Sequence, residues 1–147
     1  MKRIAVFCGS SKGVDPEYSR QAKKLGQFLA QRNIILVFGG SKMGLMEDLS
    51  EAALQAGGKV NGVMPRLLYD KGIGHPGLTE MIVAKTMHER KMRKSELCDG
   101  IIALPGGFGT LDECFEHRDM LIFSPCMENV LQKMKDYTAP DEGKWIS

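Results

Sequence analysis

Short apolar runs alternate with amphipathic segments along most of the chain. The first run, residues 2–8, is rich in strand-forming side chains and stops at Gly9, as buried strands of parallel sheets do. The next segment opens with Asp15-Pro16, a helix N-cap followed by a proline at the first helical position. Its apolar residues then recur every three or four positions up to Arg32. The pattern predicts a strand followed by an amphipathic helix.

The same alternation continues, and the repeated strand–helix–strand units predict a parallel sheet covered by helices on both faces. Further strands are expected over residues 34–38, 59–64, 80–84, 100–104 and 120–123. Further helices are expected over residues 45–56 and 87–97, from 110 to about 116, and after Ser124-Pro125. Proline, glycine and charged residues interrupt the pattern over 65–77, which predicts a loop long enough to act as a lid over a ligand.

The composition is that of one ordinary soluble domain over residues 1–147, with 43% hydrophobic and 26% charged residues. Lys and Arg number 20 against 18 Asp and Glu, and a net charge of +2 does not favour nucleic acid or a membrane surface as partner. The four cysteines lack the spacing of a metal or redox motif. No run approaches the length of a membrane span, so we expect a reduced, cytoplasmic protein.

Two predicted strand-to-helix junctions are rich in glycine: Gly39-Gly40-Ser41-Lys42-Met43-Gly44 and Pro105-Gly106-Gly107-Phe108-Gly109-Thr110. Such a turn presents free N–H groups and the positive end of a helix dipole to phosphate, although the glycines could also serve tight turns alone. Leu45-Met46 replace the Lys and Ser/Thr of a P-loop, and Asp112 replaces the third glycine of a dinucleotide fingerprint. A nucleoside monophosphate therefore fits better than ATP or NAD.

Four segments together resemble the Lonely Guy (LOG) family. Residues 104–113 resemble its PGGxGTxxE signature, residues 87–91 its MHxRK segment, residues 39–46 its GGxxxGLM loop, and residues 7–11 its opening strand and loop. The resemblance implies a doubly wound, Rossmann-like fold and a homodimer. It also implies hydrolysis of cytokinin riboside 5′-monophosphates to free base and ribose 5-phosphate, with AMP as a further substrate and without a metal or organic cofactor.

The resemblance implies that Arg90 and Glu113 are catalytic. Cleavage of an N-glycosidic bond builds positive charge on the ribose, which a carboxylate can stabilise while it orients or deprotonates water. Glu113 lies one helical turn after Thr110, where it could also complete a capping box. The substrate-binding residues expected from the match are Gly39, Gly40, Gly44, Glu80, Met87, Lys91, Gly106, Gly107, Gly109 and Thr110.

Basic residues crowd the segment around Arg90. Spacing of three and four places Arg90, Arg93 and Lys94 on one face of the predicted helix, which predicts a local anion site. The alternative is a solvated helix face. His88 could be a structural residue at the helix start or a ligand.

The chain departs from the family pattern after Glu116, which runs directly into His117. By resemblance a strand–helix unit of about 30 to 40 residues is missing there. The alternatives to a phosphoribohydrolase are a non-catalytic nucleotide- or cofactor-binding protein and an enzyme acting mainly as an AMP nucleosidase. An older label for such proteins, lysine decarboxylase, is disfavoured because no motif marks a lysine for pyridoxal phosphate.

Overall fold

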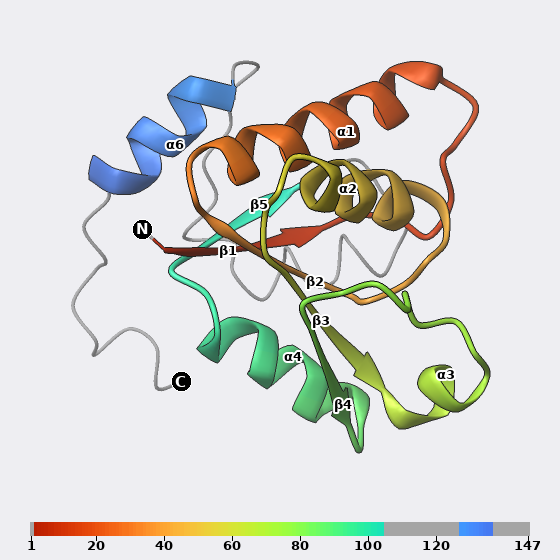
Figure 1. Cartoon of the computed structure of the whole chain (residues 1–147). Helices are drawn as coiled ribbons and strands as arrows, with labels where there is room; N and C mark the ends of the chain where they lie inside the picture. The colour runs from red at the N-terminus through yellow and green to blue at the C-terminus, as the bar shows by residue number, and fades with distance from the viewer. Residues whose placement is uncertain (1, 105–126, 137–147) are drawn as a thin grey trace.

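Five parallel strands form a single sheet in the computed structural model, which describes residues 2–104 and 127–136. Their order across the sheet is β4-β3-β2-β1-β5 (Figure 1). The strands are β1 (Arg3–Phe7), β2 (Ile35–Phe38), β3 (Val60–Pro65), β4 (Glu80–Ala84) and β5 (Gly100–Ala103). All five lie within two residues of their predicted bounds. The predicted elements at 110–116 and 120–123 lie outside the described residues.

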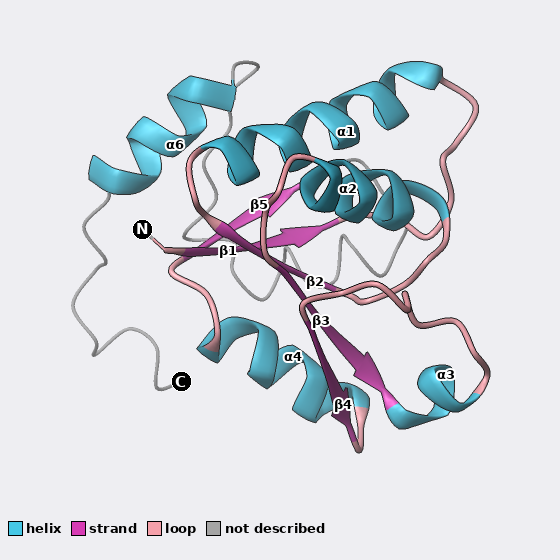
Figure 2. Ribbon diagram, in the orientation of Figure 1, coloured by secondary structure: helices cyan, strands magenta, loops and turns pink. Residues whose placement is uncertain are grey.

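Helices cover both faces of this sheet, as the alternation predicts. Figure 2 shows α1 and α2 on one face and α4 on the other. The helices are α1 (Pro16–Gln31), α2 (Gly44–Gln55), α3 (Arg66–Asp70), α4 (Met87–Glu96) and α6 (Met127–Asp136). Because β5 pairs with β1, the chain must cross the sheet after β4, and α4 makes this crossing on the face opposite α1 and α2. The fold is therefore doubly wound, and its strand order reverses between β1 and β5.

Local sequence explains where two of the crossover helices, α1 and α4, begin. The Asp15 side chain accepts a hydrogen bond from the Glu17 N–H at 2.9 Å, and Pro16 occupies the first position of α1. Thr86 accepts one from the Glu89 N–H at 3.1 Å and caps α4 in the same way. Each cap satisfies an N–H group that the helix itself leaves without a partner.

The main core lies between the sheet and α1 and α2. Alternate strand residues such as Ile4, Leu36 and Val60 point to this side, where they meet Leu29 of α1 and Leu49 of α2. All five are completely buried. The other strand positions supply a smaller cluster under α4, which consists of Ala5, Phe7, Val37 and Val63.

The segment predicted as an irregular loop over residues 65–77 is partly regular. Pro65 ends β3, and α3 follows immediately over Arg66–Asp70. The prediction is wrong here because one and a half turns of helix are too short to show an apolar period. Beyond α3, the N–H of Lys42 donates to the Ile73 carbonyl, and the N–H of His75 donates to the Gly40 carbonyl. Residues 73–75 are thus bound to the glycine turn after β2.

Candidate active site

The candidate site lies at the carboxyl edge of the sheet, where open α/β sheets bind their ligands. The parallel registers pair Phe38 with Gly62 and Phe7 with Ala103 toward this edge. Two loops leave this edge. One is residues 8–14 after β1, and the other is the glycine turn after β2, residues 39–44, whose last residue begins α2. A ligand at this edge would therefore meet both loops.

The glycine turn has a backbone that only glycine adopts readily. Gly40 has φ +83° and Gly44, which begins α2, has φ +61°. A Cβ on Gly44 would stand 2.1 Å from the carbonyl oxygen of Ser10, so the turn also requires a close approach to the loop after β1. These two positions explain the glycines at 40 and 44 by backbone geometry, and they fix the turn against its neighbouring loop.

Arg90 lies over this turn from the opposite face of the sheet. Its Nε donates a hydrogen bond to the Val63 carbonyl at 3.0 Å, and its side chain is half-buried. A Cβ on Gly39 would stand 2.5 Å from Arg90 Nη2, so a larger residue at 39 would displace the guanidinium. The structure therefore brings three residues of the predicted site together: Arg90, Gly39 and Gly40.

The other basic residues of α4 do not share one surface. Lys94 is 2% exposed and its Nζ lies 4.2 Å from the centre of the Phe7 ring, a cation–π contact. Arg93 is exposed. The predicted anion site formed by 90, 93 and 94 together is wrong, because α4 packs so that Lys94 turns toward Phe7 while Arg93 stays exposed. Burial also raises the pKa of the neighbouring Cys98 thiol.

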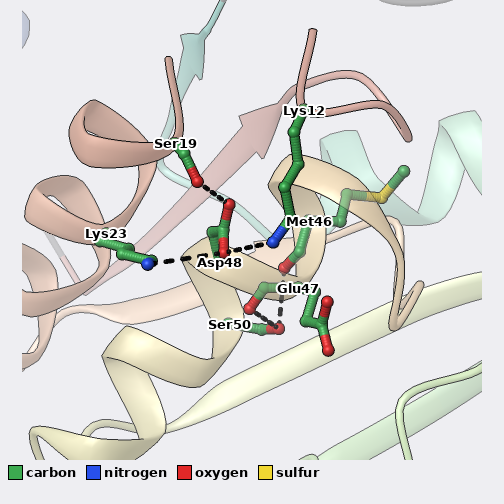
Figure 3. A network of polar contacts seen from close by, with 7 residues as sticks. All are labelled: Lys12, Ser19, Lys23, Met46, Glu47, Asp48 and Ser50. Atoms are coloured by element: carbon green, nitrogen blue, oxygen red, sulfur yellow. Dashed lines mark hydrogen bonds and ion pairs between the residues drawn. The ribbon is translucent and has the colours of Figure 1, made fainter. Parts of the chain in front are cut away.

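A buried carboxylate fixes the other side of the site. Asp48 of α2 is 5% exposed and forms an ion pair with Lys12 at 3.2 Å, as Figure 3 shows. It also accepts a hydrogen bond from the Ser19 hydroxyl of α1 and lies 4.0 Å from Lys23 Nζ. These contacts join α1, α2 and the loop after β1 next to Gly44. Sequence reasoning missed Asp48, because partners 25 to 36 residues away carry no local signal.

His75 is the second residue that sequence reasoning missed. Its side chain is 7% exposed and its Nε2 lies 2.5 Å from Glu51 Oε1 of α2. The Gly77 N–H donates to His75 Nδ1 at 3.0 Å. Nothing in the motifs singles out a histidine between a glycine and a proline, and its partner is 24 residues away.

The remaining predicted site residues lie on α4, on β4 or outside the described residues. Met87 begins α4 and is 49% exposed, and Lys91, one turn later, is half-buried. Glu80 is exposed at the amino end of β4, the opposite end of that strand from α4. The predicted residues of the second glycine loop lie outside the described residues: Gly106, Gly107, Gly109, Thr110 and Glu113. So does the junction between Glu116 and His117.

Within residues 2–104 and 127–136, no group of three or more His, Cys, Asp or Glu side chains is placed to hold a metal ion. Within the same ranges, no helix is long and apolar enough to cross a membrane.

Known proteins resemble the chain in sequence over most of its length. The family described as "possible lysine decarboxylase" matches residues 46–123, just over half of the chain. The cytokinin riboside 5′-monophosphate phosphoribohydrolase LOG5 of Arabidopsis thaliana is 48% identical over 115 residues, 78% of this chain and 50% of that protein. A cytokinin riboside 5′-monophosphate phosphoribohydrolase from Rhodococcoides fascians is 44% identical over 116 residues, 78% of this chain and 59% of that protein. The chain spans about half the length of these curated relatives.

Solved structures resemble the chain in fold. The molybdenum cofactor binding protein from Rippkaea orientalis superposes with a TM-score of 0.69 at 22% identity, covering 92% of this chain and 86% of that one. At this identity the likeness concerns the fold alone.

Proposed function

We propose that this chain, which belongs to the family described as "possible lysine decarboxylase", is a phosphoribohydrolase of purine nucleoside 5′-monophosphates. The substrates are cytokinin-type nucleotides and AMP, and the products are the free base and ribose 5-phosphate. The names of the relatives that are 48% and 44% identical support this activity. The motifs that carry the resemblance include both proposed catalytic residues, Arg90 and Glu113.

The position of Arg90 carries the proposal. Its guanidinium is held by the Val63 carbonyl and lies against Gly39, at the edge of the sheet where such folds bind ligands. A guanidinium keeps its charge at all working pH values and matches the geometry of phosphate or ribose oxygens. The adjacent turn, with Gly40 and Gly44 in positive-φ conformations, would receive the nucleotide beside it.

The reaction needs a base and a stabiliser of positive charge. Water adds to C1′ of the ribose as the bond from C1′ to the purine nitrogen breaks, and the purine leaves with the bonding electron pair and takes up a proton. Glu113 is the proposed carboxylate that accepts the proton of the attacking water and stabilises the charge on the sugar. The loop of Gly106, Gly107, Gly109 and Thr110 is the proposed phosphate site, with Lys91 and Met87 as further substrate contacts. The position of Glu80 at the amino end of β4 does not support the substrate contact expected there.

The decarboxylase in the family's description is a poorer fit to these residues. Amino-acid decarboxylation with pyridoxal phosphate requires a lysine whose amine can reach the cofactor. The buried lysine next to the site, Lys94, is 2% exposed and its amine lies over the Phe7 ring. No motif in the sequence marks a lysine for the cofactor.

We further propose that the protein is a cytoplasmic homodimer that does not bind nucleic acid. Two exposed methionines of α4, Met87 at 49% and Met92 at 47%, support a partner surface. Light scattering coupled to size exclusion tests the dimer, which a monomeric mass would exclude.

The activity is tested by incubating the purified chain with AMP and with isopentenyladenosine 5′-monophosphate. Chromatography should detect free base and ribose 5-phosphate in equal amounts. Adenosine, which lacks the phosphate, should be cleaved far more slowly. Glu113→Gln should abolish release, because an amide cannot accept the proton of water.

Two results would overturn the hydrolase. One is the absence of free base from a chain that circular dichroism shows to be folded. The other is unchanged release by Glu113→Gln. If the folded chain binds AMP by calorimetry but does not cleave it, the protein is a nucleotide-binding protein instead.

A further inference from the structure

Residues 71–77 are attached to the glycine turn by backbone bonds from both directions. Lys42 N–H donates to the Ile73 carbonyl at 3.0 Å, and His75 N–H donates to the Gly40 carbonyl at 2.8 Å. Between them, Ser41 and Gly74 form an antiparallel bridge. A change in the path of residues 73–75 would therefore change the path of residues 40–42.

His75 anchors this segment to α2. Because its Nδ1 accepts the Gly77 N–H, the ring proton is on Nε2, which donates to the Glu51 carboxylate at 2.5 Å. The His75 side chain is 7% exposed, whereas the Glu51 side chain is 45% exposed. Water therefore competes little at the imidazole nitrogens, although it reaches the Glu51 carboxylate. The imidazole thus connects residues 75–77 to the helix that the glycine turn leads into.

The Met81 side chain of β4 lies next to both the glycine turn and residues 71–77. A Cβ on Gly40 would stand 3.0 Å from the Met81 methyl group, and one on Gly74 would stand 3.3 Å from it. The turn and residues 71–77 therefore pack on the same side chain. A movement of either one would change the packing of Met81.

We propose that His75, through Glu51, is a positioning residue for nucleotide binding: it fixes residues 71–77, which in turn fix the glycine turn beside Arg90. The inference rests on the proposed function, and it assigns to this pair, a buried imidazole and a partly exposed carboxylate, a role that the motifs do not mark. His75 acts on the turn and not on Arg90, whose bond to the Val63 carbonyl is separate. Loss of the pair should therefore weaken substrate binding more than it slows the chemical step.

The experiment compares steady-state cleavage of AMP by variants at this pair. His75→Leu should raise KM about tenfold, the cost of one lost hydrogen bond to a charged group, with kcat changed less than about twofold. His75→Gln can still donate to Glu51 and should recover most of the affinity. His75→Asn can accept the Gly77 N–H but cannot reach Glu51, and should remain weak. Glu51→Leu should match His75→Leu, and the double variant should be no worse than either.

Amide hydrogen exchange gives a second readout that does not depend on cleavage. The Lys42 and His75 amides should exchange faster in His75→Leu and recover in His75→Gln. Asp70→Asn is the control, because it removes an exposed ion pair with Arg66 from the same part of the chain. It should leave KM and both amides unchanged.

The outcomes separate this inference from the proposed function. If the wild-type chain does not cleave AMP, the hydrolase fails, and AMP affinity by calorimetry together with exchange at Lys42 still decides the role of His75. If His75→Leu keeps wild-type affinity and exchange, or if His75→Gln is as weak as His75→Leu, the positioning role is wrong. If His75→Leu does not fold, the two Glu51 variants decide: Glu51→Leu should raise KM, whereas Glu51→Gln keeps an acceptor for Nε2 and should retain wild-type KM. Equal KM values for the two variants would overturn the positioning role.

Discussion

The two faces of the sheet carry different kinds of side chain. The face under α1 and α2 buries a large cluster of aliphatic and aromatic residues that includes Leu29, Phe38 and Leu49, and α6 adds Met134 to its edge. The face under α4 has a small apolar cluster with a buried ammonium, Lys94, and a half-buried guanidinium, Arg90, beside it. Figure 1 shows the two sets of helices on opposite sides of the strands.

Charges under a helix bring little stability, because their desolvation offsets their attraction to nearby groups. Apolar burial, in contrast, contributes directly to the free energy of unfolding. The difference indicates that the α1–α2 face contributes most of the stability, whereas under the proposed function Arg90 on the α4 face contributes to ligand binding. Substitutions on the two faces should therefore have separable effects on stability and on nucleotide binding.

The largest effect on stability should come from the α1–α2 face. Leu29 is 0% exposed, and Leu29→Ala should lower the free energy of unfolding by about 2–5 kcal/mol. Leu67→Ala, at a position 67% exposed in α3, should change it by less than about 0.5 kcal/mol. Urea denaturation followed by circular dichroism measures both. Equal losses at the two positions would remove the basis for calling this face the main core.

A smaller loss in the free energy of unfolding is expected for substitutions of Asp48, which lies in α2 close to the glycine turn. Asp48→Leu should cost about 1–3 kcal/mol, because the Ser19 hydroxyl and the Lys12 amine lose their buried partner. Asp48→Asn keeps an acceptor for Ser19 and should cost less. Glu17→Gln, which affects an exposed ion pair with Arg20, is the control and should cost almost nothing. Identical midpoints for Asp48→Leu and Glu17→Gln in urea would contradict this account.

The smallest effect is at the amino edge of the sheet, away from the site. The N–H groups of Lys2 and Arg3 hold the pKa of the exposed Asp99 carboxyl below its ordinary value of 3.8. The folded state then binds fewer protons than the unfolded state, so this contribution is present above pH about 4 and is lost as pH falls through the lowered pKa. Asp99→Asn should lower the melting temperature slightly at pH 6 and leave it unchanged near pH 2. A constant difference at both pH values would show that the carboxylate charge is not involved.

The elements of the fold could be predicted because each has a local signal. The Asp15-Pro16 cap, the apolar period of α1 and the glycines after β2 locate their elements from neighbouring residues alone. The predicted proximity of Gly39 and Arg90 came from a motif resemblance, and the structure places them together. The failure at α3 is one of length, because five residues do not establish a helical period.

What could not be predicted depends on contacts across the fold. Lys94 and Arg93 look equivalent in the sequence, yet only the sheet beneath α4 decides that one is buried against Phe7 and the other is exposed. Asp48 and His75 have partners on other elements, so their roles follow from tertiary structure. Burial of a charged or polar side chain is not a property of local sequence.

The most direct test of the separation between the two faces uses two arginines of α4. Arg90→Met and Arg93→Met remove the same charge from one helix, at a half-buried and at an exposed position. AMP affinity by calorimetry and the free energy of unfolding are measured for both. We expect Arg90→Met to bind AMP at least about tenfold more weakly while losing no more than about 1.5 kcal/mol of stability, and Arg93→Met to match wild type in both. Wild-type affinity in Arg90→Met, or an equal loss of affinity in Arg93→Met, would contradict the account.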